Sequence, residues 1–315
     1  MCTAVSLKGK HHCFGRNLDL ERSYDESVVI TPRNFCFPMR YVDDLTSHYA
    51  MIGMATVIQG IPLYYEVTNE KGLSMAGLNF PGNACYQKCA DEKGNVASFE
   101  LMMWILGKCS TVSEAKELLK HTQVVDVSFS EQICVSPLHW MISDKDESIV
   151  LECVEEGLKI YDNPWNVLTN NPPFEYHLLN INQYMHLHEA QSVNYLDASV
   201  DLQNFSLGFG ALGLPGDYSS VSRFVRACFV KSKLLLTDSK EDTINQFFHL
   251  LNAVSMPKGC VLCPNGEFEY TRYSCCCTDD GVYTYTTYEN SAKRSIDMKS
   301  YDLDGNLIYS NPINN

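Results

Sequence analysis

Two short segments near the start of the chain decide the fold: MCTAVSL at residues 1–7 and CFGRNLD at residues 13–19. Residues 2–7 read as a β-strand with Val5 and Leu7 on one face, and the polar run KGKHH at residues 8–12 reads as a turn. The sequence therefore predicts a β-hairpin. Because paired antiparallel strands lie about 5 Å apart, the hairpin brings residues 15–19 back to Cys2.

Cys2 directly follows the initiator methionine, and a small second residue of this kind favours removal of that methionine. Cys2 would then carry a thiol and a free α-amine, whose ordinary pKa values are about 8.5 and about 8. An amine that titrates near neutral pH can act as the base for a thiol. The start of the chain thus predicts a nucleophile that carries its own base, and an inert thiol is the alternative.

Arg16 and Asp19 lie on the returning strand of the predicted hairpin. A guanidinium beside Cys2 favours thiolate over thiol, and a carboxylate can accept a hydrogen bond from the α-ammonium and orient it. We therefore predict that both side chains flank Cys2. The alternative is a surface ion pair in a β-turn, which contributes little.

The composition is that of a globular protein and restricts the partners. The chain has 315 residues, is 45% apolar and carries a net charge of −14, which repels nucleic acid and anionic membranes. No apolar run approaches the roughly 18 residues of a membrane span, and the polar run SLKGKHH at residues 6–12 occupies the place of a signal peptide's apolar stretch. We expect a cytoplasmic protein that binds neither nucleic acid nor membrane.

The chain contains fourteen cysteines, which without an export signal indicate a reducing compartment and mostly buried, free thiols. Cys85 and Cys89 lack the second pair that a zinc site needs. The other cluster ends in a predicted strand at residues 270–278, whose side chains alternate between faces; its members are Cys260, Cys263, Cys275, Cys276 and Cys277. We expect no metal and no cofactor, and a zinc-stabilised, non-catalytic binding protein is the alternative.

The remaining pattern predicts two antiparallel meanders separated by helices. Strands are expected at residues 27–31, 49–58, 63–68 and 73–78, then at 138–143, 148–154, 158–161 and 166–169, and finally at 270–278, 282–288 and 295–301. Helices are expected at residues 98–108, 111–120, 174–188, 220–236 and 241–256. Because no linker or low-complexity segment interrupts the chain, we predict one α+β domain over residues 1–315, in which helices cover stacked sheets.

Three features outside the hairpin bear on a functional site. Asn170 ends a predicted strand just before two prolines, at a kind of position where sites are often built. Arg223 lies in the first turn of a predicted helix, which is unfavourable for a cation unless an anion is near. The motif GFGALG at residues 208–213 fits a dinucleotide-binding pattern, but LPGD follows it instead of a helix, so we predict a flexible loop.

Eight segments in consistent order, from residue 1 to residue 290, resemble the choloylglycine hydrolase family. They are MCT at 1–3, FGRNLD at 14–19, NEKGL at 69–73, AGLNFP at 76–81, LHWMISD at 138–144, LTNNP at 168–172, LPGD at 214–217 with SRF at 222–224, and TYEN at 287–290. The resemblance implies the N-terminal-nucleophile hydrolase fold, a four-layer αββα sandwich of two mainly antiparallel sheets. It also implies hydrolysis of amide bonds outside peptides, without a cofactor.

The resemblance is strongest to bile salt hydrolases, and it implies cleavage of glycine- or taurine-conjugated bile salts through a thioester on Cys2. It implies oxyanion donors and further polar groups around this nucleophile; the implied catalytic set is Cys2, Arg16, Asp19, Asn79, Asn170 and Arg223. Position in the family gives five candidates for the wall of a steroid pocket: Leu20, Ile58, Tyr65, Phe129 and Ile133. Relatives are commonly homotetramers, so we expect a homo-oligomer, as a tetramer.

Two rival activities share this fold and nucleophile: penicillin V acylase and the amidases that act on acyl homoserine lactones. In the penicillin branch the position of Asn79 tends to be tyrosine, so Asn79 favours bile salts. Both rivals remain open at this point.

Overall fold

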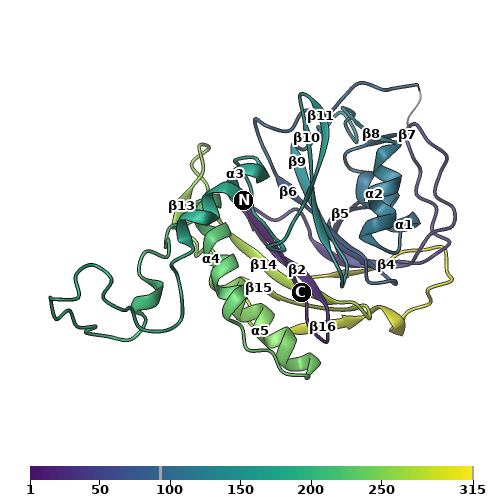
Figure 1. Ribbon diagram of the computed structural model, residues 1–315. Helices are drawn as coiled ribbons and strands as arrows, with labels where there is room; N and C mark the ends of the chain where they lie inside the picture. The colour runs from purple at the N-terminus through teal and green to yellow at the C-terminus, as the bar shows by residue number, and fades with distance from the viewer. Residues whose placement is uncertain (92–93, 314–315) are drawn as a thin grey trace.

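Two sheets stack face to face, and helices cover the outer face of each sheet (Figure 1). This computed structural model describes residues 1–91 and 94–313. The helices α1 (Leu101–Lys108) and α2 (Val112–Lys120) lie on one side, and α4 (Ser220–Lys233) and α5 (Lys240–Asn252) lie on the other. The predicted α+β class and the layer order α, β, β, α are confirmed.

The first sheet is built on the predicted hairpin, which is confirmed. β1 (Cys2–Leu7) pairs with β2 (Cys13–Leu20), and Cys2 lies opposite Leu18. The strand order is β12-β1-β2-β14-β15-β16, and β13 pairs with β14. The other strands of this sheet are β12 (Val167–Leu168), β13 (Val261–Leu262), β14 (Phe268–Thr278), β15 (Val282–Thr287) and β16 (Arg294–Asp297).

The second sheet has the order β11-β10-β9-β6-β5-β4-β3-β17. Because β6 pairs with β9, most of both predicted meanders lies in this one sheet, and the hairpin, β12 and the strands of residues 261–297 supply the other sheet of the stack. The strands are β3 (Ser27–Thr31), β4 (Met51–Ile58), β5 (Ile61–Asn69), β6 (Ser74–Asn79), β9 (Leu138–Ser143), β10 (Ser148–Val154), β11 (Gly157–Asp162) and β17 (Tyr309–Pro312).

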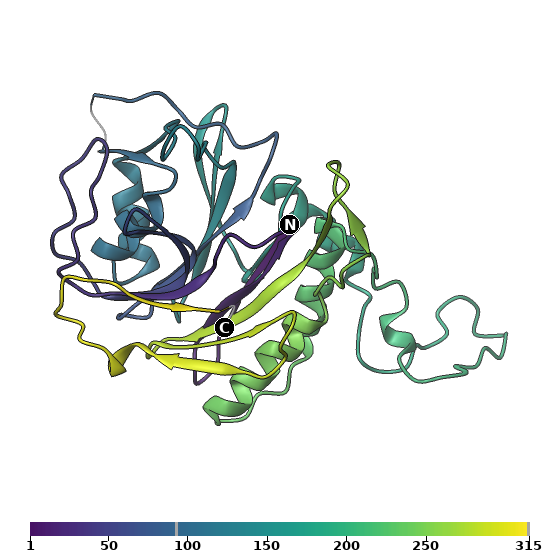
Figure 2. The same cartoon turned by 180° about the vertical axis from the view of Figure 1, so that it is seen from behind.

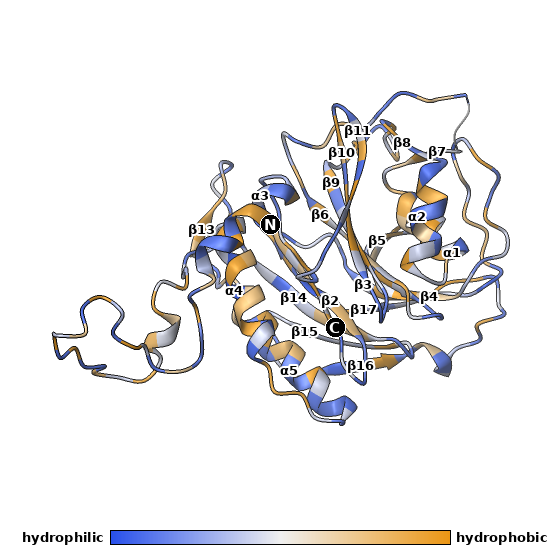
Figure 3. Ribbon diagram, in the orientation of Figure 1, coloured by the Kyte–Doolittle hydropathy of each residue, from blue (hydrophilic) through white to orange (hydrophobic). Residues whose placement is uncertain are grey.

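Three of the helices begin at side-chain caps, and the apolar sides of the helices face the sheets. The side chains of Thr111, Ser219 and Ser239 accept hydrogen bonds from backbone N–H groups in the first turns of α2, α4 and α5. One core cluster fills the space between the sheets and under α4 and α5, and another lies between the second sheet and α1 and α2 (Figure 3). The hairpin that carries Cys2 is therefore buried in the middle of the molecule.

The structure corrects two predicted elements. The helix expected at residues 174–188 is only α3 (Phe174–Asn180), followed by a 3₁₀ turn at Ile181–Tyr184. Asparagine is a poor helix former, and the Asn182 side chain donates to the last carbonyls of α3, which ends the helix. The strand expected at residues 295–301 stops at Asp297, whose side chain caps a 3₁₀ turn. Two short strands, β7 (Gly94–Ala97) and β8 (Thr122–Val125), were not predicted.

Between α3 and α4 the chain forms a long arm, defined here as residues 185–218. The arm stands clear of the sheets in both views of the molecule (Figures 1 and 2). The GFGALG motif lies in it as a loop with a 3₁₀ turn at Phe209–Ala211, as the sequence predicts. Among the described residues, no helix combines the length and the apolar character needed to cross a bilayer.

Candidate active site

Cys2 lies at the start of β1 and is almost fully buried, with 3% of its surface exposed. Its backbone N–H donates to Asn170 Oδ1 at 2.7 Å, and its carbonyl oxygen accepts from Arg223 Nη1 at 2.5 Å. Asn170 reaches Cys2 because β12, which ends two residues before it, pairs with β1. Strand pairing therefore brings Asn170 to the predicted nucleophile, and Arg223 reaches it from helix α4.

Hydrogen bonds fix both the side chain and the backbone of Asn170. Its Oδ1 also accepts from Arg223 Nη2 at 2.8 Å, and its Nδ2 donates to the carbonyl oxygen of Asn79 at 2.7 Å. Its own backbone groups bond Ser220 Oγ at 2.8 Å and His177 Nε2 at 3.0 Å. Because a side-chain amide has two donor hydrogens, one N–H of Asn170 remains for another acceptor.

Arg223 is fully buried, and its guanidinium donates a hydrogen bond to the backbone carbonyl oxygen of Cys2. Besides Cys2 and Asn170, it bonds Thr3 Oγ1 at 2.6 Å and the carbonyl oxygen of Tyr218 at 3.0 Å. Burial lowers the pKa of Arg223, while attraction to Asp19 and Cys2 opposes this shift. Asp19 Oδ2 lies 3.9 Å from Arg223 Nη1, which supplies the anion that a cation in the first turn of α4 needs.

Asp19 was predicted to bind the terminal ammonium through its carboxylate. With Met1 present, it binds the ammonium through its backbone carbonyl oxygen instead. Its carboxylate Oδ1 accepts from Thr271 Oγ1 at 2.6 Å, and its backbone carbonyl oxygen accepts from the Met1 ammonium at 2.9 Å. Met1 also forms an ion pair with Glu269, and burial lowers the pKa of its ammonium. The nitrogen of Cys2 bonds Asn170 rather than Asp19. Thr271 and Glu269 were missed because they join the site through the pairing of β14 with β2.

Arg16 is fully buried, and its Nη1 donates to the carbonyl oxygens of Tyr65 at 2.9 Å and Gly77 at 2.7 Å. Its Nε lies 3.8 Å from Glu66 Oε2, a carboxylate that the sequence analysis missed. Burial alone would lower the pKa of Arg16, but attraction to Cys2, Tyr273 and Glu66 raises it. A permanent cation thus borders the same cavity as the Cys2 thiol.

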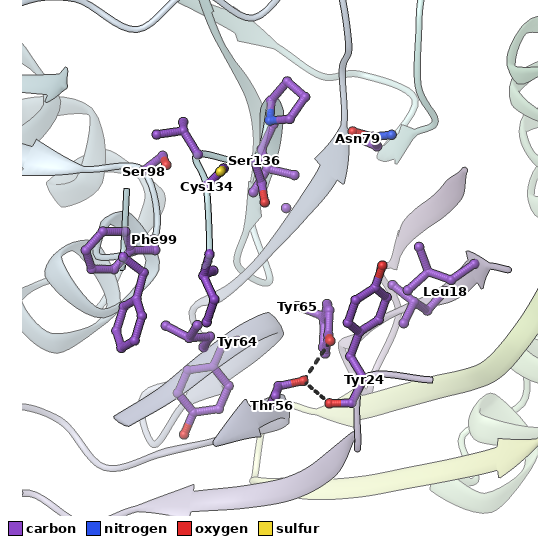
Figure 4. A pocket seen from close by; sticks show the side chains of 18 of the residues that line it. Leu18, Tyr24, Thr56, Tyr64, Tyr65, Asn79, Ser98, Phe99, Cys134 and Ser136 are labelled. Atoms are coloured by element: carbon purple, nitrogen blue, oxygen red, sulfur yellow. Dashed lines mark hydrogen bonds between the residues drawn. The ribbon is translucent and has the colours of Figure 1, made fainter. Parts of the chain in front are cut away.

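Cys2 opens into a cavity of about 530 Å³ bordered by strands of both sheets and by the loops beside them. Figure 4 shows Asn79 at one end, Tyr24 and Tyr65 at the other, and Phe99 across the cavity from the tyrosines. Thr56 Oγ1 bonds Tyr65 Oη at 2.8 Å and the carbonyl oxygen of Tyr24 at 2.8 Å. The lining includes the five residues expected in the wall: Leu20, Ile58, Tyr65, Phe129 and Ile133. All five are half-buried, so each can contact a molecule in the cavity.

Several other lining residues were missed by sequence reasoning. They fall mostly between predicted elements, where no periodicity shows which way a side chain points; examples are Tyr24, Phe99, Gln132, Cys134 and Ser136. Their only signal is proximity along the chain to predicted candidates such as Phe129 and Ile133.

The cysteines that the sequence groups together differ in burial. The run at residues 275–277 is buried in β14, whereas Cys260 is exposed. Among residues 1–91 and 94–313, no three His, Cys, Asp or Glu side chains gather closely enough to hold a metal ion. What the site offers is a cysteine beside a cation and side-chain amides at the end of an apolar cavity, an arrangement suited to acyl transfer.

Comparison with known proteins agrees with this arrangement. Residues 2–310 match the sequence profile of linear amide C–N hydrolases, choloylglycine hydrolase family. The chain is 48% identical to a bile salt hydrolase/transferase from Lactiplantibacillus plantarum, over 99% of this chain and 97% of that protein. It is 40% identical to a bile salt hydrolase/transferase from Clostridium perfringens, over 98% of this chain and 95% of that protein.

Solved structures give the same result. A conjugated bile acid hydrolase from Clostridium perfringens superposes with a TM-score of 0.92 at 39% identity, covering 100% of this chain and 97% of that one. A penicillin V acylase from Agrobacterium tumefaciens superposes with a TM-score of 0.78 at 18% identity, covering 98% and 90%. The second likeness concerns the fold alone.

Proposed function

Because the chain belongs to the choloylglycine hydrolase family, we propose that it hydrolyses the amide bond of glycine- or taurine-conjugated bile salts. The products are the free bile acid and the amino acid. The observation that carries the proposal is that Cys2 opens into a cavity large enough for a rigid, mostly apolar acyl group, lined by the five residues expected there.

In the proposed mechanism the Cys2 thiolate attacks the amide carbonyl carbon. A C–S bond forms, and the tetrahedral oxyanion accepts hydrogen bonds from the amides of Asn79 and Asn170. The C–N bond then breaks, and the α-ammonium of Cys2 gives its proton to the departing amine. Water, deprotonated by the same α-amine, attacks the thioester and releases the bile acid and the free thiol.

This mechanism requires that Met1 be removed, so that residue 2 begins the mature domain. While Met1 is attached, the nitrogen of Cys2 is an amide nitrogen that donates to Asn170 and cannot act as a base. We propose that the freed ammonium is oriented by the nearby carboxylate of Asp19, and that Arg16 stabilises the thiolate. Arg223 supports both through the backbone of Cys2 and the side chain of Asn170.

Parallel assays test the substrate. The purified protein is expected to cleave glycocholate and taurocholate much faster than penicillin V or an acyl homoserine lactone. Strong preference for penicillin V or for the lactone would overturn the proposal in favour of that rival activity. Intact-mass measurement adds a second test, because active protein that retains Met1 would defeat the nucleophile mechanism.

We propose further that the protein is a homo-oligomer, a tetramer, assembled through the arm. Several large apolar side chains of the arm are exposed by more than four-fifths of their surface: Met185, Tyr195, Leu196, Phe205 and Leu207. Exposed apolar groups gathered in one segment favour a protein contact. Light scattering of the intact protein should give a mass near four times 35.6 kDa, and a monomer would contradict the proposal. The fourteen unpaired cysteines support a reducing, cytoplasmic compartment.

A further inference from the structure

One side of the cavity is a loop without helix or strand, residues 129–137, which we call the wall loop. Seven of its nine residues line the cavity: Phe129, Gln132, Ile133, Cys134, Val135, Ser136 and Pro137. Its internal support is a tight turn in which Ile133 N donates to the carbonyl oxygen of Ser130 at 3.3 Å. A loop this lightly supported needs contacts from outside to keep one conformation.

Arg40 holds the first end of the wall loop. Its Nη2 donates to the carbonyl oxygen of Phe129 at 2.6 Å. Its guanidinium carbon also lies 6.0 Å from the ring centre of Phe129 and 5.7 Å from that of Phe99, and these two rings meet edge to face at 5.2 Å. Arg40 is itself exposed and is anchored through its backbone N–H, which donates to Glu100 Oε1 at 2.8 Å. One cation thus fixes two aromatic side chains of the cavity from behind.

Tyr86 holds the other end. Its hydroxyl donates to the carbonyl oxygen of Ser136 at 2.7 Å and accepts from the backbone N–H of Leu138 at 2.8 Å. Burial raises the pKa of Tyr86, so the hydroxyl stays protonated and able to donate. The ring of Tyr86 packs near Trp140, with ring centres 6.0 Å apart, which fixes the phenol on the second sheet. Phe80 N–H adds a bond to the carbonyl oxygen of Pro137 at 2.7 Å.

We infer that Arg40 and Tyr86 are positioning residues that set the specificity for a bulky acyl group by holding the wall loop against it, an inference that rests on the proposed function. Neither residue lines the cavity, so they act through Phe129 and Ser136. If the loop were free, each binding event would have to order it, and that entropy cost would weaken binding. The chemistry at Cys2 would be untouched, because Cys2 is held by β2 and β12.

The test separates binding from chemistry in three variants. Arg40→Met removes the guanidinium, and Arg40→Lys keeps the charge but not the planar fork. Tyr86→Phe keeps the ring and removes the hydroxyl. KM for glycocholate and the Kd of cholate are expected to rise together, about tenfold for Arg40→Met and about threefold for Tyr86→Phe. Arg40→Lys should fall between wild type and Arg40→Met, and kcat and the rate of Cys2 alkylation by iodoacetamide should stay within about twofold.

Matched controls remove comparable groups elsewhere. The hydroxyl of Tyr288 accepts a backbone N–H from Lys258 at 3.1 Å, and Tyr288 neither lines the cavity nor bonds the wall loop, so Tyr288→Phe should leave KM unchanged. Arg33 pairs with Glu70 and Asp304 instead of an aromatic pair, so Arg33→Met serves the same purpose for Arg40.

A ligand-free measurement keeps the inference independent of the substrate. Hydrogen exchange of residues 129–137 should be faster in Arg40→Met and Tyr86→Phe than in wild type, and unchanged in the controls. Unchanged exchange and unchanged KM, or a fall in kcat and alkylation rate at constant KM, would overturn the inference. If the variants show the expected faster exchange but the wild-type protein does not cleave bile salts, the proposed function fails and the inference about the loop stands.

Discussion

The cluster around Cys2 and the wall loop border one cavity but are held in opposite ways. The cluster consists of Cys2, Arg16, Asp19, Asn170 and Arg223. It lies on β1, β2 and α4 and just after β12, and its three charged members are fully buried. The wall loop has no regular structure, its residues are half-buried or exposed, and two side chains outside the cavity fasten its ends. Reaction geometry is thus built into strand pairing, whereas acyl recognition is left to a loop.

This difference predicts two kinds of mutational effect. A buried polar group has partners that lose their hydrogen bonds when it is removed, so its loss is expensive and acts on the chemistry. A half-buried apolar residue loses only contact area, so its loss is graded and acts on binding. Variants in the two regions should therefore separate into kcat effects and KM effects.

The largest expected effect is that of Cys2→Ala. Removing the nucleophile should lower kcat for glycocholate by about 10⁴-fold or more, because no thioester can form. The Kd of cholate, measured by calorimetry, should stay within about threefold of wild type, since the cavity walls are intact. Substantial turnover in this variant would contradict the role of Cys2.

Asn170→Ala is expected to come next. One oxyanion donor is worth about 3 to 4 kcal/mol, so kcat should fall by roughly a hundredfold to a thousandfold. The neighbouring Asn171 is the matched control: its side chain donates to the carbonyl oxygen of Pro81 at 2.6 Å and does not contact Cys2, so Asn171→Ala should retain kcat. Equal kcat in Asn170→Ala and wild type would remove Asn170 from the mechanism.

More residues of the cluster around Cys2 than of the wall loop could be predicted from the sequence, because part of the cluster lies on one local hairpin. The hairpin follows from local alternation, so the approach of Arg16 and Asp19 to Cys2 could be inferred from residues 1–19 alone. The placement of Asn79, Asn170 and Arg223 beside Cys2 came from family resemblance, because they lie on β6, just after β12 and on α4, each distant from Cys2 along the chain. The pairing of β6 with β9 could not be predicted for the same reason, because a long connection with no local signal joins the two strands.

Glu66, Arg40 and Tyr86 could not be found from the sequence at all. Each is an ordinary residue type for its element, and each matters only through a partner distant along the chain. Glu66 Oε2 accepts from Tyr273 at 2.7 Å, and its Oε1 accepts from Tyr283 at 2.6 Å, both across the space between the two sheets. Contacts of this kind appear only when the sheets are stacked.

Acid should destabilise the folded protein through two buried histidines, His12 before β2 and His177 on α3. Burial lowers the pKa of both His12 and His177 from 6.5 to about 4. Between these values the unfolded chain binds protons that the folded chain does not, so stability falls as pH falls from about 6.5 to about 4. The loss is about 3 kcal/mol for each histidine.

Urea unfolding at pH 6.5 and pH 4.5 measures this loss. His12→Gln and His177→Gln should each reduce the pH dependence, and the double variant should reduce it by the sum. His177 bonds the carbonyl oxygen of Asn170, whereas His12 bonds Ser6 Oγ at 2.9 Å, so only His177→Gln should also lower kcat. A pH dependence that survives in the double variant would assign it to other groups.

The smallest expected effect is that of a substitution in the wall loop, which should change KM and leave kcat nearly unchanged. Ile133→Ala removes part of an apolar contact with the acyl group, which is worth about 1 to 3 kcal/mol, so KM for glycocholate should rise about tenfold while kcat changes little. Ile160 on β11 is the matched control, because it is partly exposed and lies outside the cavity. If Ile133→Ala lowered kcat as strongly as Asn170→Ala, the wall loop would take part in orienting the reacting bond. The separation into kcat effects of the buried cluster and KM effects of the wall loop would then be wrong.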